Sequence, residues 1–149
     1  MKKYLWQLLI LSVFIISCSR HKPIVLLSPN QQVSVVIFKN DQSGYSSWSY
    51  SVFLEGKVKK IEVVETSSLG LKRNDGDFFK NLELVNVSEV STIDESYTMI
   101  AGKRKINRNH ANQFTLSFRN TNKQPLDILF RAYDTGVAFR YIFPDESSE

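Results

Sequence analysis

The side chains that could do chemistry in this 149-residue chain are fifteen carboxylates, two histidines and one cysteine. Acid–base hydrolysis needs two carboxylates held on either side of the bond that breaks. The acidic stretches at residues 74–77 and 93–95 are predicted to be loops and turns, and no spacing marks out one pair. His110 has no nucleophilic serine or cysteine motif to accompany it, and His21 lies close to the N-terminus. We therefore predict no catalytic residue.

Metal and nucleic-acid sites are also disfavoured. One cysteine and two histidines are too few for a Cys/His metal centre, so we predict neither a metal nor a cofactor in this chain. The formal charge is +4, and two of those charges, Lys2 and Lys3, belong to a predicted export signal. Without them 17 basic residues face 15 acidic ones, a net charge of +2 that gives no electrostatic reason to bind nucleic acid.

The N-terminus is typical of an exported bacterial lipoprotein. After the two lysines, an apolar run over residues 4–16 is too short to span a bilayer. Ile15-Ile16-Ser17-Cys18 resembles the lipobox, in which a cysteine after a small residue is cleaved and acylated. We predict a signal over residues 1–18, lipidation at Cys18, a tether over residues 19–23, and anchoring in the cell envelope on the periplasmic side of the outer membrane. The alternative is an ordinary secretory signal with a chance cysteine.

Two further groups of residues are candidates for binding. The densest positive cluster holds Lys103, Arg104, Lys105 and Arg108 with His110, and could meet carboxylates of a partner domain or of an acidic glycan. The alternative is a solvated strand and loop. Trp48 and its neighbours Tyr45 and Tyr50 could stack on a sugar, but Trp48 alternates with apolar residues, which favours the core.

The elements that must position these residues are strands. After residue 22 the hydrophobic pattern has a period of two, and the breaks are rich in turn-forming residues. This pattern predicts an all-β protein, an antiparallel β-sandwich. The expected strands cover residues 32–38, 48–54, 58–64, 81–87, 97–100, 113–118, 126–133 and 137–143.

The last two strands form the clearest hairpin. They flank Asp134-Thr135-Gly136, which we predict to be a three-residue connection with a glycine able to take a positive φ. Arg131 and Arg140 alternate with the apolar residues, so they are expected on the faces opposite the core. There they would extend along the surface or pair with acids such as Asp127.

The sequence of this hairpin resembles a known family. Residues 131–141, RAYDTGVAFRY, are similar to the most characteristic segment of the N-terminal domain of glycoside hydrolase family 97, which includes α-glucosidases and α-galactosidases. Weaker matches occur in the same order along the chain, and the resemblance covers nearly all of residues 24–144. The supporting segments are residues 27–38, 54–57, 68–71, 102–104 and 107–112.

The resemblance implies a super-sandwich of the galactose-mutarotase-like type that packs on a catalytic (β/α)₈ barrel. It also implies that the catalytic carboxylates and most calcium ligands belong to the barrel, and that the one calcium-binding glutamate of the N-terminal domain would lie beyond residue 149. Residues 24–149 are therefore expected to be a sandwich that is incomplete at its C-terminal end and lacks its barrel. One departure is Ala111-Asn112-Gln113, where the family pattern has Tyr-Asn-Glu.

These observations support one principal hypothesis and two alternatives. The principal one is a non-catalytic domain of an exported α-glycoside hydrolase, binding carbohydrate or supporting the substrate pocket of a catalytic barrel. The alternatives are a stand-alone envelope lipoprotein that binds carbohydrate, and a structural remnant with no ligand. The candidate contact residues are Lys103, Arg104, His110, Asn112 and Trp48.

Overall fold

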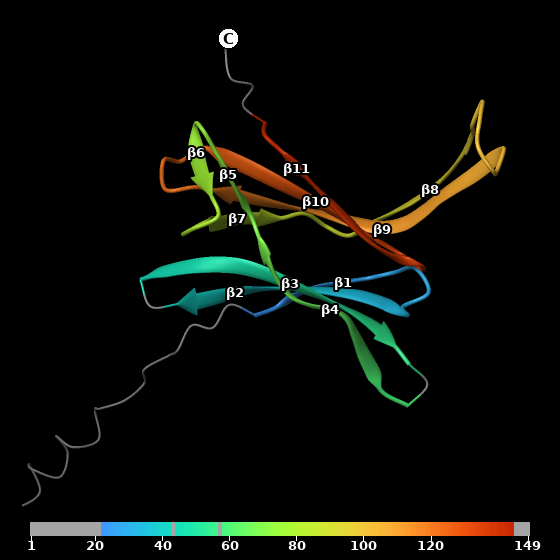
Figure 1. The fold of residues 1–149 in the computed structure, drawn as a ribbon, viewed down its shortest axis with the longest axis horizontal. Helices are drawn as coiled ribbons and strands as arrows, with labels where there is room; N and C mark the ends of the chain where they lie inside the picture. Colours follow the sequence, from blue (N-terminus) through green and yellow to red (C-terminus); the bar gives the residue numbers. More distant parts are fainter. Residues whose placement is uncertain (1–21, 43, 57, 145–149) are drawn as a thin grey trace, which may run out of the picture.

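The computed structural model describes residues 22–144, apart from residues 43 and 57, and all its regular elements are strands (Figure 1). None of the described residues belongs to a helix, which confirms the all-β prediction. The predicted signal, Cys18 and most of the tether lie outside the described residues. The strands are β1 (Ile24–Leu27), β2 (Val33–Gln42), β3 (Tyr45–Glu55), β4 (Lys60–Leu69), β5 (Leu71–Arg73), β6 (Gly76–Phe78), β7 (Glu83–Val87), β8 (Ser91–Thr98), β9 (Ile106–Arg119), β10 (Pro125–Tyr133) and β11 (Gly136–Ile142).

The first sheet has four antiparallel strands in the order β1-β2-β3-β4. Apolar residues alternate with polar ones in β2 and β3, and the register places Val35 opposite Val52. Their apolar faces therefore form one surface. At the end of the β3–β4 hairpin Leu54 is 38% exposed, although it shares the face of Trp48. Figure 1 shows this end of the hairpin pointing away from the other sheet.

The second sheet is built on β9, a strand of 14 residues. β10 pairs with one edge of β9, while β7 and β8 pair with different halves of the other edge. β11 then pairs with β10 and completes five strands. β9 extends well past the end of β7, and β8 pairs with this additional length along the same edge (Figure 1).

The strand β8 differs from the sequence prediction. We expected a strand at residues 97–100 and a loop at residues 93–95, but the strand covers Ser91–Thr98 and residues 99–100 lie in the following loop. The sequence of β8, STIDESYT, is polar, and nearly all of its side chains are exposed. Neither face is buried, so no hydrophobic alternation marks this strand. Its ladder with β9 holds it in place.

The two sheets pack face to face and form the antiparallel sandwich that the sequence predicted. Trp48 of the first sheet meets Phe118 of the second at 5.2 Å between ring centroids. Tyr50 meets Phe139 at 5.3 Å in the same edge-on manner. Such pairs contribute about 0.5–1.5 kcal/mol each beyond the area that they bury. Other core residues include Leu26, Val35, Ile37, Leu69, Phe114, Leu116, Leu126, Ile128 and Phe130.

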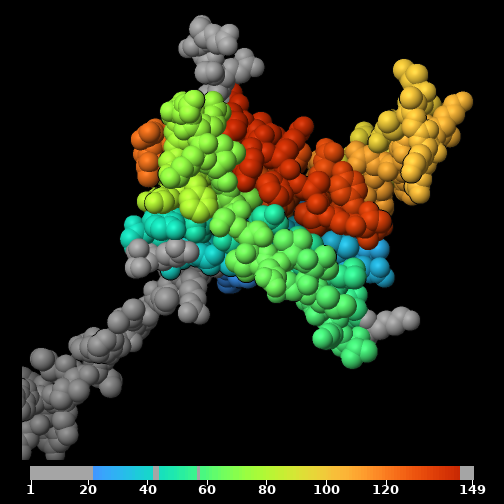
Figure 2. All heavy atoms as spheres, viewed as in Figure 1, coloured from blue at the N-terminus to red at the C-terminus, as the bar shows by residue number. Residues whose placement is uncertain are grey.

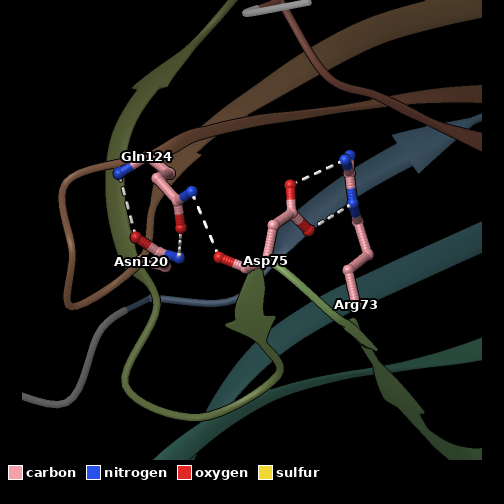
Figure 3. A network of polar contacts seen from close by, with 4 residues as sticks. All are labelled: Arg73, Asp75, Asn120 and Gln124. Atoms are coloured by element: carbon pink, nitrogen blue, oxygen red, sulfur yellow. Dashed lines mark hydrogen bonds and ion pairs between the residues drawn. The ribbon is translucent and has the colours of Figure 1, made fainter. Parts of the chain in front are cut away.

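One end of the sandwich is closed by the small β5–β6 hairpin. Figure 3 shows how its turn is joined to the β9–β10 turn: Arg73 donates two hydrogen bonds of 2.8 Å to the carboxylate of Asp75, and Gln124 donates to the Asp75 carbonyl at 3.3 Å. Asn120 donates in turn to the Gln124 side-chain oxygen at 2.7 Å. The Arg73 guanidinium also lies 4.1 Å from the ring centroid of Phe143. Polar contacts therefore tie three separate chain segments together.

The β10–β11 hairpin exists as predicted, but its turn is tighter. Tyr133 pairs with Gly136, so Asp134 and Thr135 alone form the connection. Gly136 is the first residue of β11, and its φ is not positive. The predicted three-residue loop with a left-handed glycine is therefore wrong. The Asp134 carboxylate accepts a 3.0 Å hydrogen bond from the backbone N–H of Asn30, which fixes this turn against the β1–β2 turn.

At Gly70, unlike Gly136, the backbone conformation and the close packing require a glycine. Gly70 lies where the chain leaves the first sheet, and its φ is +128°. An added Cβ would lie 2.5 Å from the Phe78 carbonyl oxygen and 2.9 Å from the Phe79 Cα. Both are backbone atoms that cannot easily move. The Gly70 N–H also donates to the Tyr141 hydroxyl at 2.9 Å, which joins this crossing to β11.

The two glycines make a matched pair of substitutions. Gly70→Ala is expected to lower the free energy of unfolding by about 1–3 kcal/mol, because it combines a strained φ with a backbone clash. Gly136→Ala is expected to change it by no more than about 0.5 kcal/mol, because nothing lies within 4 Å of the added Cβ. Urea denaturation of the full chain measures both. Equal losses would contradict the assignment of the strained position to Gly70.

Candidate functional site

The most prominent surface feature is the outer part of the β8–β9 hairpin, residues 94–110, which we call the arm. Figures 1 and 2 show it in yellow and orange, projecting from the body of the sandwich. Cross-strand pairs run from Asp94 and His110 to Thr98 and Ile106. The Met99 N–H donates to the Lys105 carbonyl at 2.8 Å and closes the loop at its end. The arm is thus a paired ribbon rather than a loose loop.

The tip of the arm is apolar and uncovered. Ile100 is fully exposed, and Tyr97, Met99 and Ile106 are exposed to a large extent. The candidate residues Lys103 and Arg104 lie in the same loop and are also exposed. Single exposed apolar residues are ordinary, but a group of four at the end of a projecting hairpin is typical of a contact surface. The sequence analysis found the basic residues and missed these apolar ones.

Nearer the body, the arm carries an ion pair. Arg108 donates through Nε and Nη2 to the two carboxylate oxygens of Asp94, at 2.7 and 2.6 Å. This hydrogen bonding lowers the pKa of Asp94 and outweighs the opposing effect of desolvation, while the charges of Arg108 and His110 act in the same direction as the hydrogen bonds. The same bonds raise the pKa of Arg108 above its ordinary value. His110 is half-buried directly across the ladder from Asp94. Asp94 is therefore an ion-pair carboxylate and not a free base.

Asn112 has a structural contact. Its side-chain amide donates to the carbonyl of Leu27 at 2.9 Å, and its oxygen accepts from the Thr92 hydroxyl at 2.7 Å. It thereby bonds the second sheet to β1 of the first. Asn112 also lines an open hollow of about 280 Å³ beside β1, together with Val25, Leu26, Leu27, Ser28, Pro29, Gln31 and Val90.

Trp48 does not lie at a surface that could take a sugar. Its side chain is 1% exposed, and its indole N–H donates to the carbonyl of Leu82 at 3.1 Å. Inside the sandwich the Trp48 ring packs edge-on against Phe118. Trp48 is therefore a core residue, as its alternation with apolar residues in the sequence favoured, and it is not a sugar-stacking residue.

The described part of the chain offers neither a cluster of metal-binding side chains nor a membrane-spanning helix. Within it, no group of three or more histidine, cysteine, aspartate or glutamate side chains could hold a metal ion. The calcium ligands that the family resemblance implies were expected in the barrel and beyond residue 149, outside the described residues. The described residues also contain no helix with the length and hydropathy needed to cross a bilayer. Cys18, the predicted lipidation site, falls outside them.

Two antiparallel sheets around one apolar core place this protein in the class of β-sandwich domains. The family model described as "Glycosyl-hydrolase 97 N-terminal" matches residues 26–149, which is more than half of the chain. The chain therefore belongs to this family, whose domain is the N-terminal part of glycoside hydrolase enzymes. The resemblance found in residues 131–141 is confirmed.

Individual relatives agree with this assignment. A probable retaining α-galactosidase from Streptomyces bingchenggensis (strain BCW-1) is 29% identical over 87 residues, which are 58% of this chain and 14% of that protein. Solved structures of a glycoside hydrolase family 97 enzyme from Pseudoalteromonas sp. strain K8, in complex with panose and with acarbose, share the fold. Each has a TM-score of 0.66 and 23% identity, over 84% of this chain and 18% of the other. This chain thus spans less than a fifth of the relatives that it matches.

The ion pair of the arm makes acid titration informative. The pKa of Asp94 is lowered in the folded state, so the pair stabilises the fold above the ordinary carboxylate pKa of about 4, and this contribution is lost as the pH falls through the lowered value. NMR titration of the Asp94 carboxyl carbon should show the depressed pKa. Arg108→Gln should return it toward its ordinary value, whereas Lys103→Gln should leave it unchanged. An Asp94 pKa unaffected by Arg108→Gln would contradict the pairing.

Proposed function

We propose that this protein is a non-catalytic N-terminal domain of an exported α-glycoside hydrolase, which supports the substrate pocket of a catalytic barrel rather than cleaving carbohydrate itself. The observation that carries the proposal is the uncovered apolar tip of the arm. The apolar tip could be buried in an apolar hollow of a partner protein, while Lys103 and Arg104 pair with carboxylates beside that hollow. The family match supports the identity of that partner, since the longer relatives carry much more chain than this domain.

Three of the carboxylates, Asp75, Asp77 and Asp94, have contacts that support a non-catalytic role. Asp94 and Asp75 are each held by an arginine through two hydrogen bonds. Asp77 accepts hydrogen bonds from the backbone N–H groups of Phe79 and Lys80; although desolvation raises its pKa, these bonds outweigh that effect and lower it. Carboxylates that serve as acceptors for fixed donors are poorly suited to give or take a proton during hydrolysis.

Cross-linking tests the partner. A photoreactive residue at position 100 of the full chain, produced in its host, should cross-link to a polypeptide that carries a catalytic glycoside hydrolase domain, identified by mass spectrometry. Val58 is a matched control, because it is equally exposed and apolar but lies in the β3–β4 turn. The purified full chain should not turn over p-nitrophenyl α-glucoside or α-galactoside. Turnover, or equal cross-linking from both positions, would refute the proposal.

We also propose that Cys18 carries the lipid that holds the domain in the cell envelope, on the periplasmic side of the outer membrane. The support is its place at the end of Ile15-Ile16-Ser17, after a basic and apolar signal. Cells given labelled palmitate should incorporate it into the wild-type chain and not into Cys18→Ala, and the variant should leave the membrane fraction. If the Cys18→Ala variant stays in the outer membrane and still carries labelled palmitate, another group anchors the chain.

A further inference from the structure

The outer face of the β10–β11 hairpin carries a second feature, which the proposed function does not use. Here an open hollow of about 150 Å³ is lined by Leu129, Arg131, Tyr133, Ala138, Phe139 and Arg140. Five of the six alternate with residues of the core, so they belong to the face that points away from the other sheet. Arg131 lies opposite Ala138, and Arg140 opposite Leu129. The small side chain of Ala138 leaves room between the two arginines.

The two arginines have no acidic partner among the described residues. The sequence suggested pairing with acids such as Asp127, but none of the ion pairs within residues 22–144 includes Arg131 or Arg140. Arg131 is half-buried, and its Nε donates to the side-chain oxygen of Gln113 at 3.1 Å. That bond holds the guanidinium of Arg131 in place and leaves its other N–H groups without a bond to the described residues. The hollow is therefore positively charged.

Other arginines of this protein show what such groups bind. Arg73 and Arg108 each hold a carboxylate through two parallel hydrogen bonds of 2.6–2.8 Å. This two-point geometry is the preferred mode of guanidinium recognition. Arg140 is exposed and its guanidinium makes no hydrogen bond to the described residues, so it is available for the same interaction.

The size and lining of the hollow restrict the ligand further. Its volume is below the roughly 300–1,000 Å³ of sites that enclose a drug-sized molecule. It suits one carboxylate with a few attached carbon atoms, which can rest on Leu129 and Ala138. The phenol of Tyr133, half-buried beside Arg131, offers a hydroxyl group to a neighbouring oxygen of the ligand.

We infer that Arg131 and Arg140 form a binding site for the carboxylate of a small organic acid, of which a sugar acid is the representative class. The site lies at β11, whereas the arm is formed at the opposite edge of the same sheet by β8. It therefore does not depend on the proposed contact with a catalytic domain, and each can fail without the other.

The test is a titration of the full 149-residue chain, labelled with ¹⁵N, in which the arginine Nε–H signals are followed by NMR at constant ionic strength. D-glucuronate should shift the signals of Arg131 and Arg140 saturably, and D-glucose, which lacks the carboxylate, should not. Acetate separates the contribution of the carboxylate from that of the sugar ring. If acetate binds as tightly as D-glucuronate, the carboxylate alone accounts for the affinity. If acetate binds more weakly, the sugar ring also contributes. No saturable shift with either acid, or an equal shift with glucose, would overturn the inference.

Variants locate the site. Arg140→Gln, at an exposed position, should weaken glucuronate binding at least about tenfold, in line with the loss of a charge-assisted pair. Ala138→Leu should have a similar effect by filling the hollow while both charges remain. Arg119→Gln removes an equal charge elsewhere in the same sheet and should change binding less than about twofold. If Arg119→Gln weakens binding as much as Arg140→Gln, the attraction is a general effect of charge and the site does not exist.

Discussion

The structure depends on the burial of one face of β9. Phe114, Leu116 and Phe118 alternate along this strand and are buried against the first sheet. Three other strands pair with β9, so its position fixes the register of the whole second sheet. Because the strand is longer than the core beneath it, its first part continues into solvent. One continuous strand thus joins the core to the arm.

Outside the core the sheet is held in a different way. The arm buries little apolar surface, and its described contacts are the ladder hydrogen bonds and side-chain pairs such as Asp94 with Arg108. Exposed pairs of this kind contribute little to stability, so the arm is the part of the domain best able to adapt to a partner. The apolar tip would gain most from being covered, because burial of side chains such as Ile100 is worth about 1.5–3 kcal/mol each. A weakly self-supported ribbon with an apolar end is consistent with a contact element.

Polar residues in this domain serve mainly to join chain segments. Asn112 connects the two sheets, Asp134 connects two turns, and the Arg73–Asp75 pair with Asn120 and Gln124 closes one end (Figure 3). The two arginines at the outer face of β10 and β11 differ from these residues, because they share the lining of one hollow and form no ion pair with the described residues. Gln113 holds the guanidinium of Arg131 without neutralising its charge, which leaves that charge available to an anionic ligand.

The sequence by itself determined the fold class, most of the strands and the family. Strands with one buried face, such as β2 and β10, show a hydrophobic period of two, and residues 131–141 carry the family pattern. The tertiary structure alone decided the extent of β8, the two-residue turn before Gly136 and the grouping of Arg131 with Arg140. The physical reason is that local sequence records burial and turn chemistry. A strand that is exposed on both faces has no hydrophobic periodicity in its sequence. A site formed by residues of two paired strands depends on the register of those strands, and contacts between residues distant in sequence determine that register.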